Sequence, residues 1–248
     1  MILTRMGNKR RIASKILPHI PEHHFWLEPF FGAGGLFFNK PRAQRNIVND
    51  LDGEVYNLFC VILDRSAELE EAWCSMPISE DLWKAWKKEV PTDPVWRAVR
   101  FLFYSNFGFL GKPQTLQYNK KNAKRLLQDR ITTTRELLYD VEFMNCDFRQ
   151  MLRRIPMSKG DRAGAFVYAD PPYLGTGNNY GEASTWREQD TRDLFAELVA
   201  SGLRFGVSEF DNPVVLDLAK QYGLRVVLIG ERHNLRNKRM EVLVTNTR

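Results

Sequence analysis

Short runs of apolar and β-branched residues recur along the chain, and this pattern constrains the fold more than any other sequence feature. Each run is bounded by turn or polar residues, as β-strands are. The runs lie at 25–30, 46–49, 141–145, 165–169, 203–208, 224–229 and 240–246. Helix-like stretches separate several of them, which predicts an α/β sheet. Because the connection 230–239 is too short for a helical crossover, the last two strands are expected to pair antiparallel.

Apolar periodicity predicts helices between these strands. The expected helices are 9–19, 52–72, 81–89, 94–106, 191–200 and 213–222. About ninety residues, 50–140, separate the second strand from the third, which is too long for a simple crossover. Much of this stretch has helical character. We therefore predict an inserted helical subdomain at 75–135, with 1–74 and 136–248 forming the other unit.

The composition favours a folded protein of a reducing compartment. The chain has 248 residues, of which 44% are hydrophobic, enough for a sizeable core. No run approaches the roughly 18 apolar residues of a membrane span, and the N-terminus lacks a signal-peptide pattern. The cysteines Cys60, Cys74 and Cys146 are odd in number and widely spaced, which argues against a disulfide framework or a cysteine-built zinc site. A cytoplasmic location without membrane association is expected.

The net charge of +6 is unevenly distributed. Residues 1–15 carry five basic residues and no acid, and residues 97–135 carry nine basic residues against one acid. Residues 66–96 carry seven acids against three lysines, which hides much of this excess. Aromatic residues are interleaved with the basic ones in 97–135. That combination suits a nucleic-acid contact, and it also suits a packed helix with a solvated charged face.

A glycine-rich turn follows the first predicted strand, in Glu28-Pro29-Phe30-Phe31-Gly32-Ala33-Gly34-Gly35. Small residues at the carboxyl end of a strand let the backbone approach a ligand closely, where open α/β sheets bind ligands. Asp50 ends the second strand and is placed to bind ribose hydroxyls. Asp52 suits the N-cap of the next helix. The glycines could instead form an ordinary tight turn that binds no ligand. Asp50 could instead cap a helix.

Two further strands also end in acids. Asp147 could accept a hydrogen bond from an adenine amine, and Phe148 could pack on the ring. The most specific signal is Asp170-Pro171-Pro172-Tyr173, which follows an apolar strand. The prolines stiffen the turn, so the Asp170 carboxylate and the Pro171 carbonyl can accept two hydrogens of one amino group. Tyr173 offers a face for stacking a planar base.

These residues together resemble the DNA adenine N6-methyltransferases of the Dam-like, D12 class family. Residues 5–9 resemble its N-terminal glycine and lysine motif, 28–35 its loop for S-adenosylmethionine (SAM), and 170–173 its catalytic motif. Their order is that of the family's α group. The family often has an aromatic residue at the position of Arg5, and segment 106–112 departs from its usual recognition pattern. The target sequence therefore does not follow.

The resemblance implies a Rossmann-like SAM-dependent methyltransferase fold, with a seven-stranded mixed sheet and the helical insert as target-recognition subdomain. The implied catalytic residues are Asp170, Pro171, Pro172 and Tyr173. The implied cofactor-binding residues are Arg5, Met6, Gly7, Lys9, Glu28, Pro29, Phe30, Phe31, Gly32, Gly34, Asp50, Asp147, Phe148 and Asp170. The expected DNA-binding residues are Arg97, Arg100, Asn106, Lys112, Lys120, Lys121, Lys124 and Arg125.

The implied reaction moves a methyl group from SAM to N6 of an adenine flipped out of double-stranded DNA, with S-adenosylhomocysteine as the second product. No metal is expected, since the four histidines show no ligand spacing. A monomer is expected, acting in a bacterial or phage-infected cell, in a restriction-modification setting. The glycine- and asparagine-rich segment 174–186 is predicted to be a lid over the flipped base, and an ordinary surface loop is its alternative.

Three other functions remain open at the level of sequence. An RNA adenine N6-methyltransferase can share the Asp-Pro-Pro-Tyr chemistry, although the placement of the insert favours DNA. A catalytically silent nucleic-acid-binding protein could keep the fold, but the intact residues 170–173 count against it. An NAD-dependent dehydrogenase would need a fuller G-x-G-x-x-G and leaves residues 170–173 unexplained.

Overall fold

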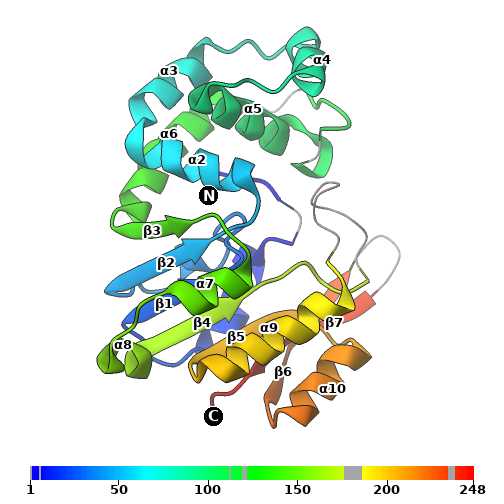
Figure 1. Ribbon diagram of the computed structural model, residues 1–248. Coiled ribbons are helices and arrows are strands. Elements are labelled where there is room, and N and C mark those ends of the chain that lie inside the picture. Colours follow the sequence, from blue (N-terminus) through cyan, green and yellow to red (C-terminus); the bar gives the residue numbers. More distant parts are fainter. Residues whose placement is uncertain (1, 6, 112, 119–121, 176–185, 234–237) are drawn as a thin grey trace.

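The computed structural model contains a seven-stranded sheet with strand order β3-β2-β1-β4-β5-β7-β6 (Figure 1). It describes residues 2–5, 7–111, 113–118, 122–175, 186–233 and 238–248. The strands are β1 (Phe25–Glu28), β2 (Arg45–Asn49), β3 (Val141–Met144), β4 (Ala165–Ala169), β5 (Arg204–Phe210), β6 (Arg225–His233) and β7 (Lys238–Thr245). Every strand expected from the sequence is present. The predicted α/β class and seven-stranded mixed sheet are therefore confirmed.

The antiparallel part of the sheet lies at the C-terminal end of the chain. β6 and β7 pair antiparallel, as the short connection predicted. β7 also pairs antiparallel with β5, so it lies between β5 and β6. In this register Glu241 of β7 stands opposite Phe210 of β5. β7, which was expected only to pair with β6, thus lies in the interior of the sheet. The Glu241 carboxylate lies there with it.

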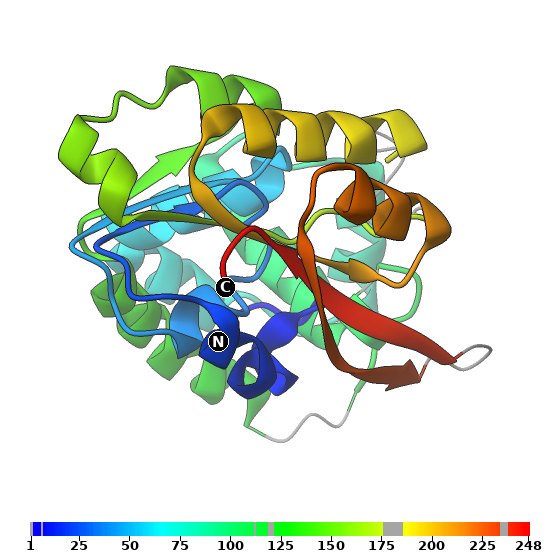
Figure 2. The same ribbon diagram turned by 90° about the horizontal axis from the view of Figure 1, so that it is seen from below.

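Helices cover both faces of the sheet (Figure 2). Alternate residues of a strand therefore pack into different layers. In β4, Phe166 and Tyr168 join the core cluster beneath the N-terminal segment and α2, whereas Val167 joins the opposite cluster. That second cluster is covered by α7 (Phe148–Arg154), α9 (Glu188–Ser201) and α10 (Pro213–Gln221). A strand buried on both faces has no polar side, which explains its continuous apolar run.

The long connection between β2 and β3 is helical in its described part. It contains α2 (Gly53–Asp64), α3 (Ser66–Ser75), α4 (Glu80–Lys88), α5 (Pro94–Phe107), the short η4 (Phe109–Gly111) and α6 (Ala123–Leu138). These helices gather beyond the β3 edge of the sheet (Figure 1). α2 and α3 pack against α5 and α6, so helices on both sides of residue 75 share one core. The boundaries 75–135 remain a prediction.

Two expected helices have different forms in the structure. The stretch 9–19 is divided into η1 (Lys9–Arg11), α1 (Ala13–Ile16) and η2 (Leu17–His19), and Pro18 lies in the first turn of the last piece. The stretch 52–72 is broken at Arg65, whose φ of −134° is not helical. The short helices η3 (Phe37–Asn39), α7 and α8 (Lys159–Gly164) were not expected. Helices of three to seven residues span too few turns to produce an apolar period.

Candidate active site

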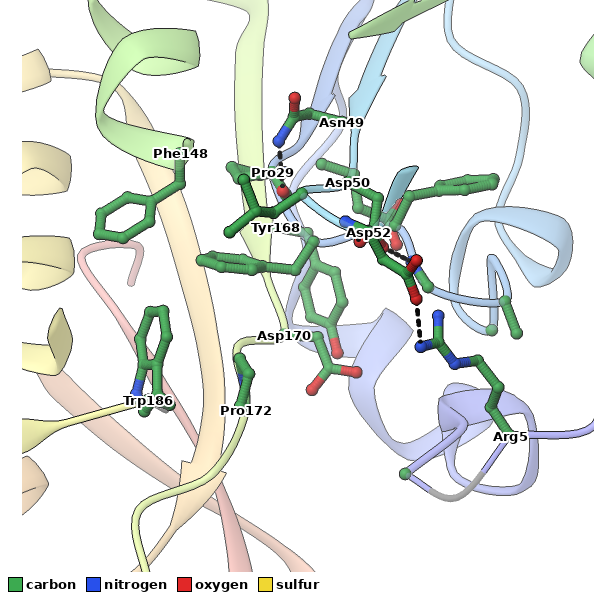
Figure 3. A pocket seen from close by; sticks show the side chains of 18 of the residues that line it. Arg5, Pro29, Asn49, Asp50, Asp52, Phe148, Tyr168, Asp170, Pro172 and Trp186 are labelled. Atoms are coloured by element: carbon green, nitrogen blue, oxygen red, sulfur yellow. Dashed lines mark hydrogen bonds and ion pairs between the residues drawn. The ribbon is translucent and has the colours of Figure 1, made fainter. Parts of the chain in front are cut away.

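A cavity of about 410 Å³ opens at the carboxyl ends of β1, β2 and β4, where an open α/β sheet places its ligands (Figure 3). Residues from the N-terminal segment, from the turns after β1 to β4, and from the start of α9 line it. All but two of the predicted cofactor-binding residues line the cavity. Those that line it are Arg5, Gly7, Lys9, Glu28, Pro29, Phe30, Phe31, Gly32, Asp50, Asp147, Phe148 and Asp170. Gly34 packs behind the wall, and Met6 lies outside the described residues.

The glycine turn after β1 is fixed from both sides. The Gly32 N–H donates to Asp50 Oδ2 at 2.6 Å, and the Phe31 N–H donates to the Asn49 carbonyl at 2.8 Å. On the other side, a Cβ on Gly35 would lie 2.4 Å from Asn8 Oδ1 and 2.7 Å from the backbone nitrogen of Lys9. Only glycine allows this approach. The turn therefore presses the N-terminal segment against the end of β1.

The two acids after β2 have different roles. Asp50 accepts hydrogen bonds from the backbone of Gly32 and, at 2.9 Å, of Asp52. Burial raises the pKa of Asp50, and the charge of Arg5 and these backbone bonds oppose that rise. Asp52 accepts from Glu54 N at 3.0 Å as the N-cap of α2, which confirms that prediction. Asp52 also forms an ion pair with Arg5 at 2.8 Å. The pair closes one side of the cavity.

Asn49 is a site residue that was not selected from the sequence. Its side chain is 1% exposed and joins the ends of three strands. Nδ2 donates to the carbonyls of Pro29 at 3.0 Å and Cys146 at 2.9 Å, and Oδ1 accepts from the Cys146 backbone at 3.0 Å. It therefore sets the spacing between the turns that form the cavity wall. An asparagine beside an aspartate at a strand end was the available signal.

Aromatic rings form the side of the cavity opposite Arg5 and Asp52 (Figure 3). The ring centroids of Phe30 and Phe148 are 5.5 Å apart, and Trp186 lies 5.5 Å from Phe30 and 5.7 Å from Phe148. Trp186 is held by a hydrogen bond from Nε1 to Thr191 Oγ1 at 2.9 Å. Such a surface suits a flat heterocycle. Trp186 is the member that sequence reasoning missed.

Asp147, expected to meet an adenine amine, has local partners in this structure. Its carboxylate caps α7 by accepting from Arg149 N at 2.8 Å, and it pairs with the Arg149 guanidinium at 3.1 Å. The same guanidinium reaches Asp190 at 2.8 Å and Asp193 at 2.6 Å. This cluster joins the start of α7 to α9. It thereby fixes the aromatic end of the cavity.

Asp170 lies at the centre of the cavity (Figure 3). It forms an ion pair with the buried Lys9. Lys9 Nζ is 2.6 Å from Asp170 Oδ1, and the Lys9 side chain is 2% exposed whereas that of Asp170 is 21% exposed. Pro172 also lines the cavity, and Pro171 is buried next to it. Asp170 is therefore a hydrogen-bond acceptor that is presented to the cavity and paired with a cation on its other side.

Tyr173, expected to offer a stacking face, is buried behind Asp170. Its ring lies 4.6 Å from Lys9 Nζ and packs edge-on against Phe210. Its hydroxyl donates to Glu241 Oε1 at 2.9 Å. Tyr173 is not among the cavity-lining residues. Segment 176–185, most of the predicted lid, lies outside the described residues.

Two predicted DNA-contacting arginines of α5 have partners inside the protein. Arg97 forms an ion pair with Glu54 of α2. Arg100 donates from Nε to the Trp86 carbonyl at 3.0 Å, and its guanidinium lies 5.0 Å from the ring centre of Tyr104. These contacts join α5 to α2 and α4. Both basic residues of α5 therefore have partners within the protein.

Two more of these candidates also make internal contacts. Asn106 is buried and donates to the Ile2 carbonyl at 3.0 Å, which holds the N-terminal segment on α5. Lys124 Nζ donates to the carbonyls of Cys74, at 2.6 Å, and Met76. Arg125 is exposed on α6. The remaining candidates, Lys112, Lys120 and Lys121, lie outside the described residues.

Within the described ranges, no group of three or more His, Cys, Asp or Glu side chains is arranged to hold a metal ion. None of the helices that the structure describes is long and apolar enough to cross a membrane.

Comparison with known proteins identifies a family and several relatives. The model of the D12 class N6 adenine-specific DNA methyltransferases matches residues 6–227. The chain is 26% identical to the Type II methyltransferase M1.LlaDCHI of Lactococcus lactis subsp. cremoris, over 97% of this chain and 93% of that protein. It is 26% identical to a DNA adenine methylase of Vibrio cholerae, over 89% and 85%. For the DNA adenine methylase of Escherichia coli K12 the identity is 27%, over 67% and 62%.

The role of Asn49 can be tested by removing its side chain. Asn49→Ala leaves the buried Pro29 and Cys146 backbone groups without partners, each at a cost of about 1–3 kcal/mol. We expect the free energy of unfolding, measured with urea, to fall by about 2–4 kcal/mol. Asn145→Ala is the control, because the exposed Asn145 bonds carbonyls that water can reach. Equal losses in both variants would contradict this role.

The buried carboxyl of Glu28 predicts a pH dependence of stability. Burial raises the pKa of Glu28 from 4.5 to about 8, against a hydrogen bond from Trp26 that lowers it. Between these values the folded protein retains a proton that the unfolded chain has lost, so stability falls as the pH rises through this window. Glu28→Gln should flatten the fall in melting temperature between about pH 5 and 8. Glu142→Gln, at an exposed site, should leave this fall in melting temperature unchanged. If melting temperature fell with pH equally in wild type and Glu28→Gln, the raised pKa of Glu28 would be refuted.

Proposed function

The chain belongs to the D12 class N6 adenine-specific DNA methyltransferases, and from this premise we propose that its cavity binds SAM and presents Asp170 to an adenine of double-stranded DNA. It is an enzyme that methylates adenine at N6 in DNA. The observation that carries the proposal is the position of Asp170, which lies at the centre of the cavity beside an aromatic wall.

The residues of the cavity fit SAM in size and in chemistry. A volume of about 410 Å³ lies within the range of small-molecule sites. Phe30, Phe148 and Trp186 offer apolar faces for the adenine ring, and Asp50 lies where ribose hydroxyls are expected. Residues of the turn 32–35 and residues 7–9 line the rest of the cavity, where the methionine part would lie. Bound SAM supplies an electrophilic methyl group, and the protein's task is to bring the target amine to it.

Asp170 and the Pro171 carbonyl form the acceptor pair in this proposal. The adenine amine is a poor nucleophile because its lone pair is delocalised into the ring. Accepting its two hydrogens would localise that lone pair and stabilise the positive charge that develops on nitrogen. Holding the amine in line with the methyl group would supply the proximity effect. The ion pair with Lys9 supports this role, because it keeps Asp170 an acceptor.

Access to the site requires that the adenine leave the duplex, so we propose base flipping. We also propose a lid formed by 174–186 and a monomeric enzyme. Stacking of Tyr173 on the flipped base is part of the proposal, and it requires that the ring, which is buried behind Asp170, become exposed to the base. The placement of the helical insert supports its role in target recognition. The bacterial relatives support action in the cytoplasm of a bacterial or phage-infected cell.

The choice of DNA over RNA rests on the family and its relatives, which are DNA methylases. The broad match to a Type II methyltransferase supports a modification enzyme of that kind. Sequencing with modified-base detection, on DNA from cells that express the chain, would reveal the target sequence. N6-methyladenine in transfer or ribosomal RNA but not in DNA would favour the RNA alternative.

The role of Asp170 is tested by Asp170→Asn, which keeps the shape and removes the charge. Methyl transfer from labelled SAM to unmethylated genomic DNA should fall by about 10²–10³-fold, because one preorganised electrostatic contact is lost. The dissociation constant for SAM, measured by calorimetry, should change by less than about threefold. The control is Asp211→Asn, an exposed acid after β5. Transfer by Asp170→Asn at the wild-type rate would exclude the proposed acceptor.

The helical layer generates a second prediction, with neighbouring residues as a matched pair. Arg125→Gln should weaken binding to all DNA sequences and reduce the slope of log K against log salt by about 0.9, the effect of one lost phosphate contact. Lys124→Gln should instead lower the melting temperature, since its ammonium holds the end of α3. Filter binding and thermal unfolding measure the two effects. An unchanged salt slope in Arg125→Gln would leave Arg125 as a solvated surface charge.

A further inference from the structure

We propose that Glu241 is a positioning residue for methyl transfer, which holds Lys9 and Tyr173 so that the Asp170 carboxylate keeps a surplus of negative charge toward the cavity. This inference rests on the proposed function of Asp170. Glu241 lies on β7 and was not selected from the sequence.

The position of Glu241 follows from the antiparallel insertion of β7. Because β7 lies between β5 and β6, its residues are in the sheet interior, and Glu241 is 1% exposed. A carboxylate there loses its hydration, which is costly unless polar groups replace the water. A strand at the edge of the sheet would not have brought this side chain behind the cavity. The burial of a charged residue at this point therefore needs an explanation.

The contacts of Glu241 converge on one oxygen. Glu241 Oε1 accepts a hydrogen bond from the Tyr173 hydroxyl at 2.9 Å and lies 3.5 Å from Lys9 Nζ. Lys9 in turn donates to the Gly7 carbonyl at 3.0 Å and pairs with Asp170 at 2.6 Å. One carboxylate thus contacts both the lysine that pairs with Asp170 and the tyrosine whose ring lies beside that lysine. Asp170, Lys9 and Gly7 of this group line the cavity, whereas Tyr173 and Glu241 are not among the lining residues.

Charge explains why a second carboxylate is useful here. If Lys9 paired with Asp170 alone, the ammonium would neutralise the carboxylate that must stabilise a developing positive charge. Glu241 shares the same ammonium, so these three side chains carry one net negative charge in a buried setting. Electrostatic effects are strong where water is excluded. Removing the charge of Glu241 should therefore destabilise the transition state for methyl transfer more than it weakens the binding of either substrate.

A neighbouring carboxyl provides the matched control. Glu209 of β5 is also buried, and burial raises its pKa to about 8. Its oxygens accept backbone hydrogen bonds from Phe210 at 2.8 Å and Leu174 at 3.1 Å. Glu209 thus stabilises backbone beside the cluster, and no ion pair joins it to Lys9 among the described contacts. Glu209→Gln therefore measures the cost of losing backbone hydrogen bonds beside the cluster without breaking an ion pair of Lys9 that the structure describes.

The test compares Glu241→Gln, Tyr173→Phe, the double variant and Glu209→Gln, at a temperature where circular dichroism shows each to be folded. Glu241→Gln should lower kcat by about tenfold or more, with KM for SAM and for unmethylated genomic DNA within about threefold of wild type. The double variant should lose less than the product of the single losses, because the two residues share one hydrogen bond. Glu209→Gln should lower the melting temperature but keep kcat within about threefold.

The outcomes separate this inference from the function it rests on. An inactive wild-type enzyme would overturn the proposed function and the inference with it. An active wild type and an inactive Asp170→Asn, together with a kcat for Glu241→Gln near that of wild type, would overturn the inference alone. Equal losses of kcat in Glu241→Gln and Glu209→Gln would reduce Glu241 to a structural role. If Glu241→Gln does not fold, Tyr173→Phe measures the loss of the same hydrogen bond, and an unchanged kcat there would reject the proposal.

Discussion

The buried ion pair between Lys9 and Asp170 is the interaction on which the rest of the site depends. It joins the N-terminal segment to the turn after β4, two parts of the chain separated by about 160 residues. Lys9 could not be buried without an anionic partner, since an unpaired charge in a protein interior is strongly destabilising, and Asp170 is the nearer of its two carboxylate partners. The close approach of Gly35 to Asn8 and Lys9 makes this pairing possible, because a side chain at position 35 would push the segment away.

The other walls of the cavity are built from ends of strands and are held by polar side chains that serve the backbone. Asn49 and Asp50 join the turns after β1, β2 and β3. The Arg149 cluster joins α7 to α9 and so places Phe148 near Trp186. Such local uses of polar groups give a rigid site, and rigidity is what preorganised electrostatic catalysis requires.

The helical layer shows how a charge count can mislead. Nine basic residues between 97 and 135 suggested a DNA-binding surface. Arg97, Arg100 and Lys124 instead stabilise contacts among α2 to α6, and Asn106 anchors the N-terminal segment. Charged side chains with long apolar stems can serve both purposes at different places on one helix. Burial and partners, which composition does not contain, decide which purpose each one serves.

The sequence by itself determined the seven strands, the antiparallel last pair, the glycine turn, the Asp52 cap and the Asp170–Tyr173 motif, because each depends on residues close together in the chain. It also determined most of the cavity lining, since parallel strands bring their carboxyl ends to one edge. Only the tertiary structure decided that Asn49 and Trp186 belong to the site, that Tyr173 faces Glu241, and that β7 enters the sheet interior. Those features depend on contacts between segments that are distant in the sequence. The energies of such contacts depend on packing and burial, so the contacts leave no local pattern in the sequence.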